Sequence, residues 1–173
     1  EQGRFMRALE RRDRLDREIE FLPNDEDLSD RVAANKGLTR PEFAVVQSYA
    51  KMVLYDDLLA SDLPQDEYFT DDLIAYFPKL IQRKHLSAIT GHSLRREIVA
   101  TLIANSVVNR VGATFINNVM EETGHAPADI ARAYAAARGV FDFRSLWADI
   151  SSLDNKVDAA VQTRMNQASE ALL

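Results

Sequence analysis

Cysteine is absent from this sequence of 173 residues, and glycine and proline are scarce, with six and five residues respectively. The absence of cysteine excludes disulfide scaffolds, thiolate catalysis, iron–sulfur clusters and Cys-ligated zinc. Because so few residues interrupt regular structure, long stretches of the chain can form helices, whereas a many-turned sheet would need more glycine and proline. The composition therefore favours an all-α fold over a β-sandwich or barrel.

A long apolar run and a surplus of basic residues are also missing. No stretch approaches the roughly 20 apolar residues of a membrane span, and no basic-then-apolar signal opens the chain, so we expect a cytoplasmic protein without a membrane partner. The net charge of −6 argues against a nucleic-acid partner, because phosphate binding needs an excess of Lys and Arg. The first residue is Glu1 rather than methionine, which predicts a fragment of a longer protein.

The hydrophobic pattern predicts an irregular bundle of about eight helices. An N-terminal amphipathic helical arm is expected over residues 1–22, and a single all-helical domain over residues 23–173. Acid-first i,i+4 pairs support the arm, namely Glu10–Arg14 and Asp13–Arg17. The arm packs on a partner or on a missing N-terminal part of the protein, or it is a surface helix that lies on its own domain. Aliphatic residues surround most of the segment 94–111, which we therefore expect to be the central helix.

Helix boundaries are marked by capping residues. Thr39 and Glu42 form a T-x-x-E capping box, so a helix starts there and buries a face that begins at Phe43. Pro127 fits the first turn of another helix. The remaining predicted signals are helix stops at Gly37, Gly91, Gly124 and Gly139, a bend at Gly112, and caps at Asn24 or Asp25 and at Asp142.

Candidate metal sites find little support. His85, His92 and His125 are the only histidines, and none stands three or four residues from another, so structural or surface roles are expected. His92 lies where it can serve the turn that leads into the central helix. Seven acids lie between Asp56 and Asp72 without a base among them, but the segment has no glycine for an EF-hand loop. Helix caps and a solvated acidic loop explain it better than a cation site, and attraction of a basic partner is the remaining alternative.

A polar stripe on the central helix is the most unusual feature. Thr101, Asn105 and Asn109 follow at i, i+4 and i+8 and share one face of an otherwise aliphatic helix. Buried amides need hydrogen-bond partners, so the stripe is expected to bind neighbouring backbone or to specify helix register. A subunit or domain interface is the second reading, and a small-molecule pocket is the third. Further donors for an interface could come from Arg95, Arg96 and Arg110.

Motifs for cofactor and acyl chemistry are missing. The sequence has no G-x-G-x-x-G, no G-x-x-x-x-G-K-[ST] and no G-x-S-x-G, and no strand–helix alternation that would hold such a loop. We therefore predict no catalytic, cofactor-binding or metal-binding residue in this chain.

Several short segments point to a known family. They are GLTRPEFAVV (37–46), YAK (49–51), LYDDLLASDLP (54–64), YFPK (76–79), LRREI (94–98), ANSVVNR (104–110), EETG (121–124), DIARAY (129–134) and LDNKV (153–157). In this order they resemble the C-terminal region of the large bacterial NAD-specific glutamate dehydrogenases. The resemblance covers nearly the whole chain, from about Arg4 to Met165.

The resemblance implies that the parent protein oxidises L-glutamate to 2-oxoglutarate and ammonia while it reduces NAD. Its catalytic lysines, its aspartate and its Rossmann domain lie upstream in the family, so no catalytic role transfers to this chain. The implied partners are the remainder of the same polypeptide and further copies in a homo-oligomer. A structural, assembly or regulatory role is expected.

Two alternatives remain open. A free-standing helical adaptor could bind a separate protein through residues 4–22 and the acidic loop. An independent helical enzyme could use Asn105, Asn109 and the arginines, although no known arrangement of catalytic residues supports it.

Overall fold

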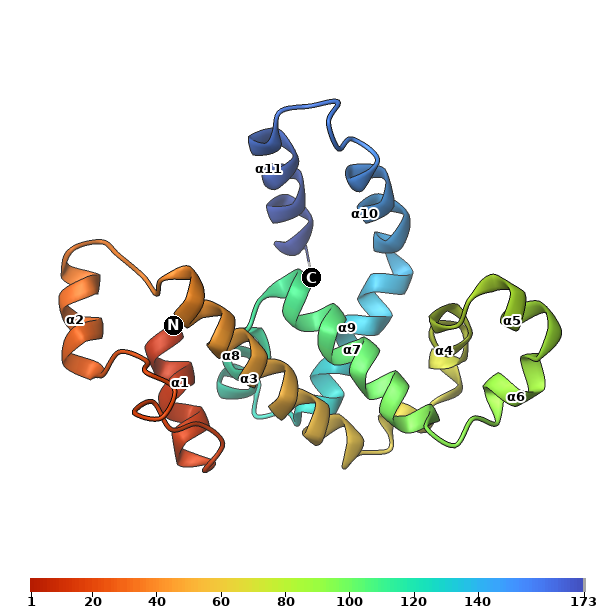
Figure 1. The fold of residues 1–173 in the computed structure, drawn as a ribbon, viewed down its shortest axis with the longest axis horizontal. Coiled ribbons are helices and arrows are strands. Elements are labelled where there is room, and N and C mark those ends of the chain that lie inside the picture. Colours follow the sequence, from red (N-terminus) through yellow and green to blue (C-terminus); the bar gives the residue numbers. More distant parts are fainter. Residues whose placement is uncertain (173) are drawn as a thin grey trace.

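The computed structural model describes residues 1–172, which form eleven α-helices and two short 3₁₀ helices without a strand (Figure 1). The predicted all-α multi-helix bundle is confirmed, with more helices than expected because the segment 67–90 divides into short pieces. In chain order the elements are α1 (Gln2–Arg11), α2 (Asp25–Ala33), α3 (Arg40–Leu59), η1 (Leu63–Gln65), η2 (Glu67–Phe69), α4 (Thr70–Tyr76), α5 (Lys79–Lys84), α6 (Leu86–Thr90), α7 (Arg95–Val111), α8 (Phe115–Thr123), α9 (Pro127–Val140), α10 (Phe143–Ser151) and α11 (Ala159–Glu170).

The centre of the fold is the pair α3 and α7, which pack on each other more extensively than any other two elements. Each helix buries one apolar face, as expected for an amphipathic helix. The buried residues are Val46, Ala50, Val53, Leu54 and Leu58 of α3 and Val99, Ala100, Ile103, Ala104, Val107 and Val108 of α7. The segment 94–111 is thus the central helix, and it is packed on most sides as predicted, since η1, α4, α8 and α9 also contact α7 and only Thr101 and Asn109 of this helix are exposed.

The predicted helix over residues 4–22 ends early, at Arg11. Asp13 adopts a left-handed backbone conformation (φ 52°), so the chain turns away and residues 12–22 form turns instead of a continuing helix. Phe5, Met6 and Leu9 of α1 are buried in the same core as α3 and α7. α1 therefore packs on the chain's own helices, while the division into an arm (1–22) and a domain (23–173) stays a prediction.

Local capping signals are mostly confirmed. Asn24 caps α2 in a capping box with Asp27, and Thr39 with Glu42 starts α3. Pro127 stands at the first turn of α9. Gly124 ends α8 in the left-handed conformation (φ 73°), which glycine adopts without strain.

Four boundary predictions need correction. Asn35 rather than Gly37 takes the left-handed position after α2 (φ 54°). Gly139 does not stop α9, which continues to Val140. Asp142 precedes α10 in the left-handed region but makes no side-chain cap. Phe43 is 37% exposed rather than buried, because the inward face of α3 begins one turn later at Val46.

Gly139 permits a close approach between α9 and the ring of Tyr68. A Cβ atom at this position would clash with the Tyr68 hydroxyl, which donates a hydrogen bond to the carbonyl of Ala135 (2.9 Å). The glycine therefore serves packing instead of helix termination.

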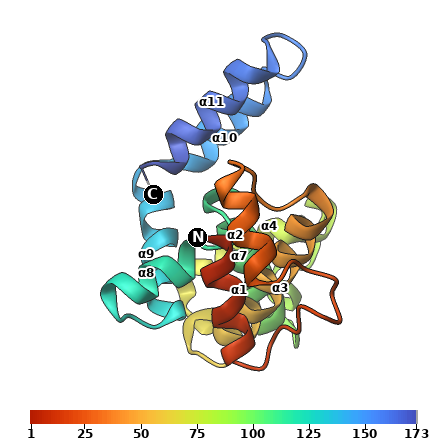
Figure 2. The same cartoon turned by 90° about the vertical axis from the view of Figure 1, so that its left-hand side faces the viewer.

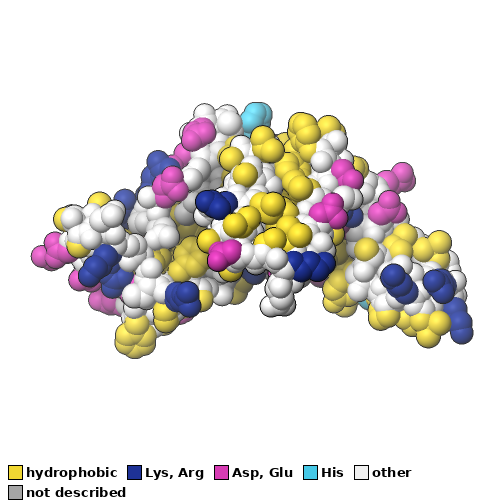
Figure 3. Space-filling model, turned by 90° about the horizontal axis from the view of Figure 1, so that it is seen from above, with side chains coloured by type: hydrophobic (Ala, Val, Ile, Leu, Met, Phe, Trp, Pro, Cys, Tyr) yellow, Lys and Arg dark blue, Asp and Glu magenta, His cyan; other side chains and the backbone are white. Residues whose placement is uncertain are grey.

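The helices α10 and α11 form a hairpin that projects from the rest of the chain (Figures 1 and 2). Its base is held by Trp147, which stacks on Phe143 (5.5 Å between ring centroids) and donates a hydrogen bond to Ser169 Oγ (3.1 Å). Apolar side chains gather over the middle of the molecule in Figure 3. On the hairpin itself, Leu146 of α10 and Met165 of α11 are 41% and 42% exposed.

None of the helices within residues 1–172 has by itself the length and apolar composition of a membrane span. The pair α7 and α8 reaches that threshold only when taken together, with a bend of 89° between them.

The ionised Glu42 carboxylate makes the stability of the fold depend on pH. Two hydrogen bonds from the Arg31 guanidinium (2.6 and 3.0 Å) and one from the Thr39 N–H hold the pKa of this carboxylate at about 2, below its ordinary value of 4.5. Because the folded-state pKa is lowered, the stabilisation is present above about pH 5 and is lost as the pH falls towards 2. Glu42→Gln should therefore lower the urea midpoint at pH 7 and approach the wild-type midpoint near pH 2.

The matched control is Glu26→Gln, which removes an exposed carboxylate from the first turn of α2. A constant difference between the Glu42→Gln and wild-type midpoints over this pH range would contradict the prediction.

A double-mutant cycle tests the contact at Gly139. Alanine is ordinarily favoured over glycine in a helix by up to ~1 kcal/mol, but here its methyl group displaces the Tyr68 hydroxyl. Gly139→Ala should thus be more favourable in a Tyr68→Phe background than in the wild type, with a coupling of about 1 kcal/mol in the free energy of unfolding. Equal effects in both backgrounds would show that the approach is not tight.

Candidate functional site

The predicted polar stripe lies on the outer face of α7. Thr101 and Asn109 are exposed and Asn105 is half-buried, because the inward face of the helix is filled by the aliphatic residues that contact α3. Thr101 Oγ1 donates a hydrogen bond to the carbonyl of Glu97 in its own helix (2.7 Å). The reading of the stripe as buried amides that fix helix register is therefore wrong, whereas its reading as an interface stays a prediction.

A surface groove of about 480 Å³ runs between α3 and α7 beside the stripe. Met52 is half-exposed in the groove, and the small side chain of Ala104 keeps it open. The lining residues are Lys51, Met52, Tyr55, Asp56, Thr101, Ala104 and Asn105. The groove joins apolar contact area to an ammonium, a carboxylate, an amide and two hydroxyls, a mixture of apolar and hydrogen-bonding groups that is also found at protein interfaces.

The three arginines predicted to serve this interface are used elsewhere. Arg95 Nη2 donates to the carbonyl of Asp66 and to Thr70 Oγ1 (both 3.3 Å), and Arg96 Nη2 donates to the carbonyls of Leu59 (2.5 Å) and Ser61 (3.0 Å). Arg110 lies over the ring of Trp147, 4.4 Å from its centroid, as a cation–π contact. They therefore tie α7 to the loop after α3 and to α10, and the structure does not bring them to the stripe.

The acidic segment 56–72 supplies counter-charges for the chain's own arginines. Five of the seven acids pair with arginines from the loop after α1, from α9 and from α10, and Arg132 binds two of these acids. The pairs are Asp56–Arg14 (2.9 Å), Asp57–Arg12 (2.6 Å), Asp62–Arg132 (2.9 Å), Asp66–Arg132 (3.7 Å), Asp72–Arg138 (3.1 Å) and Asp72–Arg144 (2.5 Å). Most acids of the expected solvated loop thus form ion pairs with arginines of other segments. The predicted use of these acids as helix caps is seen at Asp66, which caps η2.

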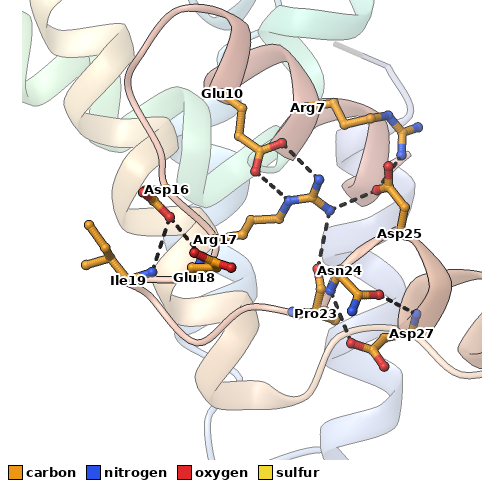
Figure 4. A network of polar contacts seen from close by, with 10 residues as sticks. All are labelled: Arg7, Glu10, Asp16, Arg17, Glu18, Ile19, Pro23, Asn24, Asp25 and Asp27. Atoms are coloured by element: carbon orange, nitrogen blue, oxygen red, sulfur yellow. Dashed lines mark hydrogen bonds and ion pairs between the residues drawn. The ribbon is translucent and has the colours of Figure 1, made fainter.

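Arg17 is the hub of the largest polar network at the N-terminal end (Figure 4). Its guanidinium, 15% exposed, donates two hydrogen bonds to Glu10 (2.6 and 2.9 Å) and one each to Asp25 (2.9 Å) and the carbonyl of Pro23 (3.3 Å). These contacts raise the pKa of Arg17 and, together with Arg7, lower the pKa of Asp25. The predicted pairs Glu10–Arg14 and Asp13–Arg17 do not form, because the chain turns at Asp13.

A second polar cluster is buried between α4, α7 and α9. Arg138 is only 6% exposed; its Nη2 donates to Asp72 (3.1 Å) and its Nη1 to Ser106 Oγ (3.3 Å). The Ser106 hydroxyl is also bonded to the hydroxyl of Tyr134 (2.8 Å), and burial raises the pKa of that tyrosine. The cluster is a structural cross-link, since these four side chains bind one another, and Nε of Arg138 is left buried without a partner among the described residues. Sequence reasoning missed it because its members lie 28 to 66 residues apart.

The histidines do not form a metal site. Among residues 1–172, His, Asp and Glu side chains nowhere gather in a group of three that could hold an ion. His92 Nδ1 accepts a hydrogen bond from the N–H of Leu94 (3.1 Å) just before α7, so its predicted role in the turn that leads into the central helix is confirmed.

Comparisons with known proteins give one consistent result. A family model described as glutamate dehydrogenase, C-terminal, matches residues 35–173. The chain is 45% identical over 162 residues to the NAD-specific glutamate dehydrogenase of Halomonas elongata and 44% identical over 162 residues to that of Pseudomonas aeruginosa; each match covers 94% of this chain and 10% of the relative. Identity to the NAD-specific glutamate dehydrogenase of Mycobacterium tuberculosis is 35% over 133 residues, covering 77% of this chain and 8% of that protein. The chain thus spans about a tenth of the length of these relatives. No solved structure matches.

The buried cluster predicts a large effect for one carboxylate. Asp72→Asn should lower the free energy of unfolding by about 3 kcal/mol, because it leaves the Arg138 guanidinium buried without a counter-charge. Urea denaturation measures the effect, and Asp71→Asn, at the adjacent exposed acid, is the control expected to change stability by less than about 0.5 kcal/mol. Equal effects of the two substitutions would mean that the Asp72–Arg138 pair is not a buried cross-link.

Proposed function

Because the chain belongs to the glutamate dehydrogenase C-terminal family, we propose that it is a non-catalytic helical domain of an NAD-specific glutamate dehydrogenase. The parent polypeptide oxidises L-glutamate with NAD and water to 2-oxoglutarate, ammonia and NADH. The family match over residues 35–173 is the observation that carries this proposal. The substrate and cofactor follow from the names of the relatives, which are about ten times longer than this chain.

The residues of this chain do not fit a dinucleotide cofactor. A Rossmann site places clustered glycines in the turn between a strand and a helix, so that the backbone can approach the pyrophosphate. The nearest two glycines, Gly112 and Gly124, stand on opposite sides of α8, and residues 1–172 contain no strand. NAD therefore binds to the part of the polypeptide outside this chain.

The charged side chains support a structural role. Within the described residues, many of the arginines and acids form ion pairs between segments remote in sequence, as at Asp72 with Arg138 and at Asp57 with Arg12. A catalytic acid or base needs an unoccupied position facing its substrate. These ion pairs instead stabilise the domain. Its outer surfaces, such as the groove between α3 and α7, contact the rest of the enzyme and further copies in a cytoplasmic homo-oligomer.

Activity and assembly measurements test the proposal that catalysis belongs to the rest of the polypeptide and that this domain has a structural role. The full polypeptide should reduce NAD with L-glutamate, measured as absorbance of NADH, whereas residues 1–173 alone should show no turnover and no heat of NAD binding in calorimetry. Deleting residues 1–173 from the full polypeptide should lower its melting temperature or change its assembly state in light scattering, because the surfaces that pack on this domain are then exposed.

Turnover of glutamate by residues 1–173 alone, or binding of NAD to them, would overturn the proposal. So would a deletion that leaves both the melting temperature and the assembly state of the enzyme unchanged.

A further inference from the structure

The end of the molecule formed by α5 and α6 has an unusual charge. No acidic residue occurs between Asp72 and Glu97, although the protein as a whole has a net charge of −6. Arg95 and Arg96, at the end of this stretch, donate to backbone carbonyls within the fold. The three bases that remain are Lys79, Arg83 and Lys84, all on α5.

These three cations are exposed and lack the partners that arginines have elsewhere. Among the side chains described in residues 1–172, no carboxylate forms a salt bridge with Lys79, Arg83 or Lys84, whereas arginines of α1, α2, α9 and α10 do form salt bridges. Single cations elsewhere in the described part of the chain, such as Lys36 and Lys156, also lack a salt bridge, but the α5–α6 lobe, defined as residues 76–94, gathers three of them on one short helix in a stretch without an acid.

Apolar side chains lie among these cations. Leu80 is 62% exposed, Leu86 51% and Ile81 37%. Figure 3 shows yellow and dark blue side chains side by side at the right-hand end, over α5 and α6. Exposed aliphatic groups gathered on one surface are typical of a contact site, because covering them removes apolar area from water.

The two helices of the lobe are short and weakly anchored. α5 has six residues and α6 has five, and Ile89 is the one buried residue of the pair. Helices of this length are unstable by themselves, so a partner that covers them would also stabilise their backbone. This observation concerns the backbone and is independent of the charge pattern.

From these features we infer that the α5–α6 lobe docks onto an acidic surface with an apolar centre on the remainder of its own polypeptide. The inference rests on the proposed function, since the relatives are about ten times longer than this chain. Carboxylates on that surface pair with Lys79, Arg83 and Lys84, and its apolar centre covers Leu80 and Leu86. Covalent linkage keeps this surface at a high effective concentration, so modest complementarity suffices. A lipid surface fits less well, because the lobe bends at His85 and lacks one continuous amphipathic helix.

Zero-length carbodiimide cross-linking of the full polypeptide tests the contact directly. The reagent joins lysine amines to carboxylates in salt-bridge contact, so Lys79 and Lys84 should be linked to Asp or Glu outside residues 1–173 of the same polypeptide. Mixing ¹⁴N- and ¹⁵N-labelled enzyme distinguishes links within one polypeptide from links between copies. Lys36 and Lys156, which are exposed on other elements, serve as controls expected to give few such links. Links confined to residues 1–173, or found only between copies, overturn the inference.

A charge-reversal variant of the full polypeptide gives a second readout. Lys79→Glu/Arg83→Glu/Lys84→Glu should speed amide hydrogen exchange in residues 79–90 by about tenfold, while exchange in residues 95–111 stays unchanged as evidence of intact folding. The control Lys36→Glu/Arg40→Glu/Lys156→Glu makes the same change in net charge at exposed cations elsewhere and should leave residues 79–90 unaffected. Unchanged exchange in the first variant overturns the inference.

Vesicle binding and enzyme activity separate the docking site from a membrane contact and from the proposed function. Binding of the full polypeptide to phosphatidylserine vesicles that the lobe variant abolishes would overturn the inference in favour of a membrane surface. Cross-links to the remainder of the polypeptide support the inference even when the enzyme lacks glutamate dehydrogenase activity, in which case the proposed function fails alone. An active enzyme without these links retains the proposed function and refutes the docking site.

Discussion

α3 and α7 bury apolar faces against each other, and η1, α4, α8 and α9 also pack on α7, so the two helices provide the surface to which the other elements attach. Leu9 of α1 belongs to this core at one end, and Leu73 of α4 belongs to it at the other. Because both helices are amphipathic, their outer faces remain available, and the groove beside Met52 and Asn105 lies on that side. The same packing thus determines which surfaces the domain can offer to the rest of an enzyme.

Ion pairs then fix the peripheral helices on this central pair. The acids of segment 56–72 lie at one end of α3, in the loop that follows it and in the first turn of α4, and they bind arginines that are remote in sequence, such as Arg12 and Arg138. Exposed pairs of this kind contribute little each, but the buried Asp72–Arg138 pair specifies how α9 meets α4. An acidic composition is therefore compatible with a domain that folds around its own arginines and has no role in cation binding.

Sequence signals predicted those features whose causes lie within a few residues. The box of Thr39 and Glu42, the proline at 127 and the role of His92 in the turn before α7 are all local, and the structure contains each of them. Tertiary packing decided the others. Only the position of α3 shows that Asn105 faces outward, and only the ring of Tyr68 explains Gly139. The contact of Arg17 with Glu10 depends on a turn at Asp13 that no neighbouring residue signals.

Trp147 gives the domain a built-in optical reporter. It is the single tryptophan of the chain, and its indole lies where Arg110 of α7, Phe143 of α10 and Ser169 of α11 meet. Fluorescence from this residue reports whether the α10–α11 hairpin is packed on α7, and it does not respond to unfolding of α1 and α2. Far-ultraviolet circular dichroism, in contrast, averages over all helices. A hairpin that separates before the central pair unfolds would therefore appear as two transitions that do not coincide.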